Sequence, residues 1–180
     1  PVGNTSDFSD YYLGDEIDKG YNLNDDVYSI TSKIARTISN QIVWKVREVN
    51  TITNESEDVE GTELQSLLSN PNTYETLSEF REKCISYLLL SGNNFVGGIK
   101  PINKKGYESI HVLPAQYVDV EQGTLSEPIR SITVSWELQE DWDIKDVSIT
   151  KYPSLDLDSY FIGHSPLKSG TRLLESSNDL

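Results

Sequence analysis

Apolar residues recur every three or four positions in two stretches of this chain, and that spacing predicts two amphipathic helices. The first helix begins at Asn24 or Asp25, where a short polar side chain can accept the free amide hydrogens of the first turn, and it ends near Asn40. Its apolar stripe consists of Val27, Ile30, Ile34 and Ile38. We expect this stripe to face the core.

The second helix is longer and follows the turn Asn70-Pro71-Asn72. The residue before a proline disfavours helical backbone, so the helix should begin near Asn72 or Thr73. Gly92, followed by Asn93, ends it, because glycine readily adopts the left-handed backbone of a helix C-terminus. Its apolar face contains Leu77, Phe80, Cys84, Tyr87 and Leu88.

Alternation of apolar and polar residues predicts strands at 42–49, 95–99, 108–113, 116–121, 129–138 and 147–151. Leu113 and Pro114 close the third of these, and Gly97 and Gly98 in the second indicate a bulge or a close backbone contact. Polar loops are expected at 54–60 and 139–146. The order of helices and strands predicts an α+β fold with a mostly antiparallel sheet packed with several helices. We expect the largely buried residues to include Ile34, Trp44, Phe80, Tyr87, Leu88 and Trp136.

The charge of the chain is strongly negative, with 29 acidic against 15 basic residues and a net charge of −14. Affinity for nucleic acids depends largely on basic side chains that neutralise phosphates, so this composition argues against tight, direct DNA binding. The single cysteine, Cys84, cannot form an intramolecular disulfide, and no apolar run reaches membrane-spanning length.

The polar composition also divides the chain. Residues 1–23 are expected to form a flexible acidic N-terminal arm, and residues 24–180 one α+β domain. The sequence contains no methionine, and a helical pattern is still in progress at Leu180. We therefore expect the chain to be a fragment of a longer protein.

Residues that could carry chemistry form only partial motifs. The segment Gly163-His164-Ser165-Pro166-Leu167 lacks the second glycine of a hydrolase elbow, and proline does not suit that strained turn. We predict instead that Ser165 caps a last helix with Pro166 at its first position. His111 and His164 have no second ligand at zinc spacing. The loop acids Asp141, Asp143, Asp156 and Asp158 lack the register of a calcium loop. We expect no catalytic, cofactor-binding or metal-binding residue.

Five segments, in this order, resemble the N-terminal wing region of the portal proteins of tailed bacteriophages, of the long-tailed-phage type. The resemblance covers roughly residues 24 to 175. The matching segments are a helix opened by Asp26-Val27-Tyr28, with a strand at Ile42 to Val46 after it; Asn70-Pro71-Asn72 ahead of a helix with an aromatic at Phe80; Leu88-Leu89-Leu90-Ser91-Gly92-Asn93; Leu113-Pro114 followed by Tyr117-Val118; and a strand at Asp146 to Lys151 before Gly163, Ser165, Pro166 and Leu167.

The resemblance implies a structural subunit of a phage or prophage portal ring at the capsid vertex. Such a ring forms the conduit for DNA packaging and ejection and the connection between head and tail. It implies a dodecamer, a packaging ATPase (terminase), and capsid and head-completion or tail proteins as partners. Double-stranded DNA would pass through without sequence-specific binding, and no membrane is involved. The location implied is the virion, after assembly in the host cytoplasm.

Two other functions stay open from the residues alone. One is a small-molecule hydrolase with His164 and Ser165 in its site. The other is a non-viral protein-interaction module of α+β fold.

Overall fold

The computed structural model describes residues 17, 21–102, 105–136, 138–153 and 161–167 of the 180-residue chain. These residues form an α+β fold of helices packed on antiparallel strands, as the sequence predicts. The single mostly antiparallel sheet expected from the sequence is divided into three separate antiparallel sheets.

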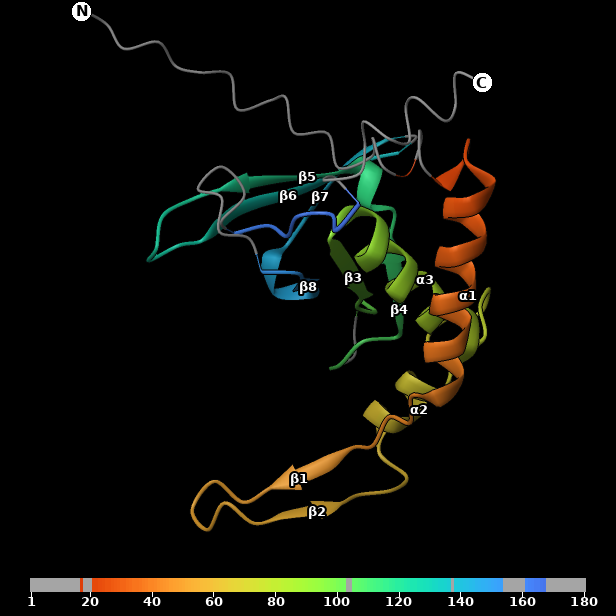
Figure 1. Cartoon of the computed structure of the whole chain (residues 1–180). Helices are drawn as coiled ribbons and strands as arrows, with labels where there is room; N and C mark the ends of the chain where they lie inside the picture. Colours follow the sequence, from red (N-terminus) through yellow and green to blue (C-terminus); the bar gives the residue numbers. More distant parts are fainter. Residues whose placement is uncertain (1–16, 18–20, 103–104, 137, 154–160, 168–180) are drawn as a thin grey trace, which may run out of the picture.

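The helices begin and end at side chains that satisfy free backbone groups. Helix α1 (Asp25–Gln41) begins after Asn24, whose side-chain oxygen accepts the N–H groups of Asp26 and Val27. Helix α2 (Glu63–Ser69) begins after Thr62, whose side chain accepts the N–H of Gln65. Helix α3 (Leu77–Ser91) lies between α1 and strand β3 and ends at Gly92, in the left-handed conformation. Figure 1 shows α1 and α3 side by side.

The strands form three groups. The central sheet has the order β4 (Ser109–Leu113), β3 (Asn93–Ile99), β8 (Val147–Lys151), and Phe95 is opposite both Leu113 and Ile149. The outer sheet is a meander of β5 (Val118–Gln122), β6 (Ile129–Ser135) and β7 (Gln139–Trp142). The β1–β2 hairpin pairs Arg47–Val49 with Ser56–Asp58 and projects from the body below α2 (Figure 1).

The core joins the two larger sheets to the C-terminal end of α3. Phe95 and Ile132 are fully buried in it, one from each sheet, and Leu90 enters from the helix. Its other buried members are Ile17, Val27, Leu113, Ala115, Val118, Val134 and Val147. Ile17 belongs to the segment for which the sequence predicts a flexible arm; most of that segment lies outside the described residues.

Adjacent glycines on β3 allow aromatic rings to pack against the strand. A Cβ atom on Gly97 would lie 2.5 Å from the ring of Trp142, and one on Gly98 would lie 2.5 Å from the ring of Tyr107. The glycines therefore accommodate side-chain rings, and not the bulge or close backbone contact that the sequence predicts; the pairing of β3 with β4 is regular at both positions. Trp142 belongs to β7, so this contact also joins the outer sheet to the central one.

The predicted inward face of α1 is confirmed at Val27 and wrong at its three isoleucines. Ile30, Ile34 and Ile38 are exposed, and the buried face consists of Val27, Thr31, Ala35 and Ser39. Small side chains allow α1 to lie close to α3, and the Ser39 hydroxyl donates to the carbonyl of Ser78 at 2.8 Å. Branched isoleucines in place of Thr31, Ala35 and Ser39 would hold the two helices apart. The stripe therefore remains on the surface.

The predicted core list is confirmed at one position and wrong at two. Phe80 is 2% exposed, whereas Ile34 is 40% and Trp136 68% exposed. Trp44, Tyr87 and Leu88 are partly buried. Trp136 continues the alternation of β6, but the strand ends at Ser135, so the pattern extends past the sheet that would cover it.

Strand boundaries differ most from the prediction where the sequence is polar. Only Arg47–Val49 of the predicted strand 42–49 is paired as a strand; at the start of the segment Ile42 is tied to α3, because Arg81 donates to its carbonyl at 2.6 Å. Strands β2 and β7 lie in the expected loops. Polar contacts hold them in place of apolar alternation: Asp58 accepts from Lys45 and Arg47 at 2.8 and 2.7 Å.

The start of α3 is also later than predicted. The side chain of Asn72 accepts the N–H groups of Tyr74 and Glu75, and this local turn competes with helix. The helix begins only after Thr76, which forms a capping box with Glu79.

Candidate functional site

The structure brings four of the sequence-predicted motif residues into one place, defined here as the junction: residues 91–93 together with 163–165. Asn93 is fully buried, and its amide nitrogen donates to the carbonyls of Ser91 and Gly163 at 3.0 Å each. Its amide oxygen accepts the N–H of Gly163 at 2.5 Å. One side chain thus replaces a strand partner for a segment 70 residues further along the chain.

Glycine at two positions allows the backbones of the junction to touch. A Cβ atom on Gly92 would lie 2.3 Å from the carbonyl carbon of His164, and one on Gly163 would lie 2.1 Å from the carbonyl oxygen of Gly92. That oxygen also accepts the N–H of Tyr152 at 2.9 Å. The junction therefore fastens the chain after β8 to the corner between α3 and β3.

A second group of motif residues fastens the turn before α3 to β4. Pro71 is fully buried, and its carbonyl accepts the N–H of Ile110 at 2.8 Å. The side-chain amide nitrogen of Asn72 donates to the carbonyl of Ile110 at 3.0 Å. The backbone N–H and the backbone carbonyl of Ile110 are therefore both hydrogen-bonded to this turn. Phe80 packs edge-on against Trp44, with ring centroids 6.2 Å apart. Asn70 is exposed, and its N–H completes α2.

The remaining motif residues also contribute packing and turns. Leu113 is part of the core, and the carbonyl of Pro114 accepts the N–H of Tyr117 at 2.9 Å. Ser165 is 3% exposed, and its hydroxyl oxygen accepts the N–H of Leu167 at 3.1 Å, which is the capping geometry predicted for it with Pro166 next in the chain. The helix predicted to follow lies outside the described residues.

The geometry of Ser165 does not suit a nucleophile. Its hydroxyl is buried and engaged with the backbone of Leu167, and the backbone of Gly92 packs against His164 and Ser165. His111 lies on β4, where its ring nitrogen is 2.9 Å from the hydroxyl of Ser109.

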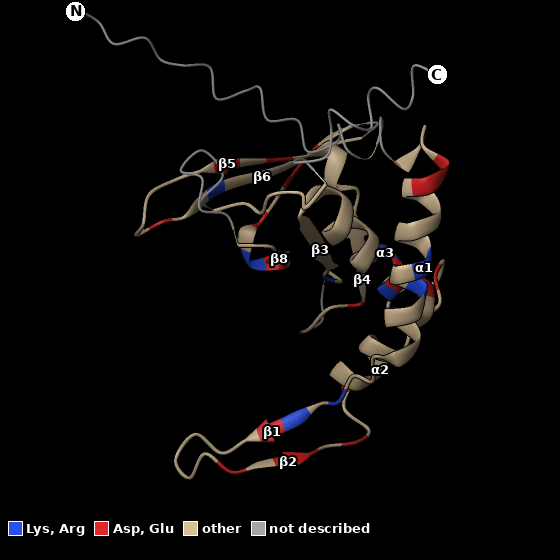
Figure 2. Cartoon of the chain, in the orientation of Figure 1, with Lys and Arg blue, Asp and Glu red and all other residues tan. Residues whose placement is uncertain are grey.

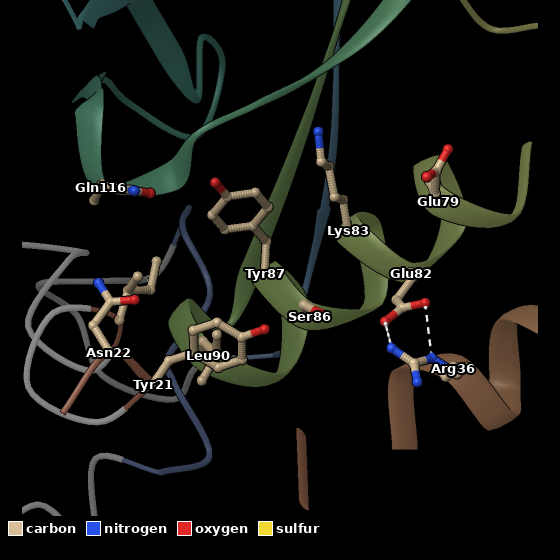
Figure 3. A pocket seen from close by; sticks show the side chains of 11 residues that line it. Tyr21, Asn22, Arg36, Glu79, Glu82, Lys83, Ser86, Tyr87, Leu90 and Gln116 are labelled. Carbon is tan, nitrogen blue, oxygen red and sulfur yellow. Dashed lines mark hydrogen bonds and ion pairs between the residues drawn. The ribbon is translucent and has the colours of Figure 1, made fainter. Parts of the chain in front are cut away.

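A cavity of about 470 Å³ lies between α1, α3 and the residues Ile17, Tyr21, Asn22 and Gln116. Figure 3 shows Tyr87 pointing toward Gln116 across it. Glu82 accepts hydrogen bonds from Arg36, and this raises the pKa of the guanidinium. The N–H and hydroxyl of Thr76 lower the pKa of Glu79, and burial raises the pKa of Tyr87. None of these shifts brings a group of this cavity toward neutral pH, where proton transfer would need it.

A more apolar cavity of about 520 Å³ lies between α2, α3 and the central sheet. Cys84 lines it, and burial raises the pKa of that thiol to about 11. The side chain is therefore a neutral thiol at physiological pH and a weak nucleophile. Other lining residues include Trp44, Leu67, Leu68, Phe80, Leu88 and Val96.

The acidic loop residues considered for a hard cation are not brought together. Asp141 lies on β7 and accepts the hydroxyl of Thr133 at 2.9 Å, whereas Asp143 caps a 3₁₀ turn through the N–H of Lys145. Asp156 and Asp158 lie outside the described residues. Over the ranges described, the structure contains no group of three histidine, cysteine or acidic side chains arranged to hold a metal ion. None of the helices placed in these ranges is long and apolar enough to cross a membrane.

Sequence reasoning found the residues of the junction but not their contact. The approach of Gly92 to Gly163 joins residues 71 positions apart in the sequence, and no local pattern signals it. The signal that could have found it is the pair of glycines, each followed by a polar residue that can bond to backbone.

No family model matches this chain, and no curated protein matches it in sequence. Its fold does match solved structures. A chain in the neck of an empty GTA particle, computed with C6 symmetry, has a TM-score of 0.72 at 19% identity, over 92% of this chain and 44% of that one. A chain in the neck of a native GTA particle, computed with C12 symmetry, has a TM-score of 0.67 at 18% identity, over 92% and 42%.

A chain in the virion of a native gene transfer agent (GTA) particle matches with a TM-score of 0.71 at 18% identity, over 96% of this chain and 43% of that one. At these identities the comparison establishes a shared fold. The present chain spans less than half the length of each of the three solved chains.

Proposed function

We propose that this chain is the wing part of a structural subunit of a phage or prophage portal ring, placed at the capsid vertex of the virion. The observation that carries the proposal is the fold shared, over 92–96% of this chain, with chains of the neck and virion of a gene transfer agent particle. Two of those neck structures were computed with C6 and C12 symmetry, which supports a subunit that repeats around an axis. The sequence segments that resemble portal wings support the proposal independently.

The placement of the motif residues agrees with a structural role. Gly92, Asn93, Gly163 and Ser165 are used to join backbone to backbone at the junction, and none of them presents a free reactive group. The burial of Ser165 supports this structural role over the hydrolase alternative.

The charge supports a conduit through which DNA slides. A net charge of −14 disfavours contacts with phosphates, and each such contact would add salt-dependent affinity and resist movement. In this proposal the subunits form a dodecamer that receives DNA from a packaging ATPase. The ring later contacts head-completion or tail proteins, after assembly in the host cytoplasm.

Self-association tests this proposal. The 180-residue chain and the same chain extended through the coding sequence that follows it should be compared by light scattering and electron microscopy. We expect the short chain to be monomeric or weakly associating, because a ring contact joins two different patches and neither has to be strongly apolar. The extended chain should form a closed ring. A stable dimer of the short chain, with no ring from the long one, would favour an unrelated interaction module.

A further inference from the structure

The β1–β2 hairpin has no supporting surface within the described part of its own copy. Its strands pair only with each other there, and all six strand residues are exposed. Two apolar residues of the hairpin, Val49 and Ile52, are 55% and 89% exposed. An isolated two-stranded ribbon is at best marginally stable in water. The hairpin would therefore be stabilised by a surface that covers these apolar residues.

The outer face of α1 offers a surface of matching character. Ile30, Ile34 and Ile38 follow one another at intervals of four residues and therefore form one line along the helix; they are 60%, 40% and 40% exposed. Lys33 lies beside this line and forms no ion pair with any residue that the structure describes.

The charges of the hairpin and of α1 beyond its first turn are opposite. Residues 27–41 of α1 contain two basic residues, Lys33 and Arg36, and no acidic one, in a chain that is strongly acidic overall; Arg36 is paired with Glu82, and the two acidic residues of the helix, Asp25 and Asp26, lie in its first turn. Residues 48–60, which form most of the hairpin, contain five acidic residues and no basic one, and Figure 2 shows the acidic colour along β2 and the segment after it. Asp58 is held by Lys45 and Arg47 of its own copy. Among described residues, Glu48, Glu55, Glu57 and Glu60 form no ion pair.

The hairpin cannot cover the helix of its own copy. It leaves the body near the C-terminal end of α1 and runs toward the opposite side of the molecule, so its tip points away from α1 (Figure 1). A contact between these surfaces therefore requires two copies. Because it joins two different patches, it is heterologous and can repeat around a ring.

We propose that the β1–β2 hairpin of one copy docks on the outer face of α1 of the next copy. Val49 and Ile52 cover the line of Ile30, Ile34 and Ile38, and Glu55 and Glu57 approach Lys33. This inference rests on the proposed function, since a portal ring supplies the neighbouring copy. It adds to that function the two surfaces through which neighbouring subunits contact each other in this region.

Cross-linking between two pools of the extended chain tests the contact directly. One pool carries Ile34→Cys and the other Ile52→Cys, and both carry Cys84→Ser, so that the introduced thiol is the target. After the pools are mixed and assembled, a short bis-maleimide should yield a cross-linked dimer that neither pool yields alone. The control replaces Ile52→Cys by Leu125→Cys, on the β5–β6 turn, which is 82% exposed and should yield none. An equal yield from the control would overturn the proposal.

Charge reversal tests the electrostatic part. Lys33→Glu, or Glu55→Lys with Glu57→Lys, should each lower the association constant about fivefold or more, because like charges then face each other. The variant with all three changes should recover most of that loss. Glu127→Lys, on the exposed β5–β6 turn, serves as the charge control and should recover nothing when combined with Lys33→Glu.

The outcomes separate this inference from the proposed function. If the unaltered extended chain forms no ring, the proposed function fails. If it forms a ring that shows no specific cross-link and is unaffected by every charge reversal, the proposed function stands and the hairpin contact is overturned. In that case the hairpin and the α1 face bind something other than a second copy.

Discussion

At the junction, Asn93 is fully buried and both polar atoms of its amide bond to the backbone, whereas in the β1–β2 hairpin every strand residue is exposed to solvent. The junction is held by short-range contacts between backbone groups and contains no charged side chain. The hairpin is held by ion pairs to Asp58 and has few apolar contacts.

The junction makes its contacts within one copy of the chain, whereas the hairpin leaves its strand residues exposed to solvent. A buried hydrogen-bonded amide is costly to disturb, because a partner left unpaired retains its full desolvation penalty. An exposed ion pair contributes little and is screened by salt. Substitutions should therefore divide sharply between the two regions.

The largest effect should come from Phe80→Ala. Phe80 is 2% exposed and packs against Trp44, so its removal leaves a cavity and should lower the free energy of unfolding by about 3–5 kcal/mol. Trp136→Ala removes a larger ring that is mostly exposed, and should cost less than about 1 kcal/mol. Denaturant unfolding of both variants measures the difference. Equal stability of Phe80→Ala and the parent would contradict the burial of this residue.

Gly92→Ala and Gly61→Ala compare the two regions at matched backbone angles. Both glycines have positive φ, 76° at Gly92 and 75° at Gly61. A Cβ atom on Gly92 would meet the backbone of His164, whereas a Cβ atom on Gly61 would meet no atom within 4 Å. Gly61→Ala should cost only the left-handed backbone penalty of about 1–2 kcal/mol. Gly92→Ala should cost about 1–3 kcal/mol more, because the backbone must move. Similar losses from both variants would show that the junction can relax freely.

Ser165→Ala should have a smaller effect, about 1 kcal/mol on the free energy of unfolding, because it removes only the hydrogen bond to the N–H of Leu167. Ring assembly should be unaffected. Thermal unfolding and light scattering together check both statements. A hydrolase turnover that disappears with this substitution would return the serine to a catalytic role.

The smallest effect concerns pH and the hairpin. Hydrogen bonds from Lys45 and Arg47 lower the pKa of Asp58 below its unfolded value of about 3.8, so the ion pairs stabilise the hairpin above that value and are lost as the pH falls through the lower folded pKa. In NMR spectra between pH 5 and 2, amide signals of Val49 and Ser56 should shift before those of Asn93. Asp58→Asn should abolish this early change, and its persistence would place the titrating group elsewhere.

Local signals predicted the elements that depend on local physics. Asn24 begins a helix and Gly92 ends one where the sequence places them, because a cap satisfies backbone groups within a few residues. Strands β3, β4 and β8 follow from apolar alternation. Strands β2 and β7 could not be predicted this way, since polar side chains join them to their partner strands and their own sequences do not alternate between apolar and polar residues.

The isoleucine line shows why periodicity alone does not identify the core. A three-and-four spacing indicates that a helix has an apolar face, but the partner decides which face is buried. On α1, Thr31, Ala35 and Ser39 permit close approach to α3, and the isoleucines lie to one side. Likewise, the motif residues of the candidate site were found by resemblance, while their contacts depend on segments far apart in the sequence.

The position of the outer sheet in the chain has a consequence for biosynthesis. Its meander, β5 to β7, lies between β4 and β8, so β3 pairs with β4 soon after synthesis but with β8 only about fifty residues later. At ribosomal rates of roughly 5–20 residues per second, one hydrogen-bonding edge of β3 stays unpaired for about 3–10 seconds. The junction closes only after that, since Gly163 follows β8. A cell that makes this chain must prevent the unpaired edge of β3 from pairing with other nascent strands during that interval.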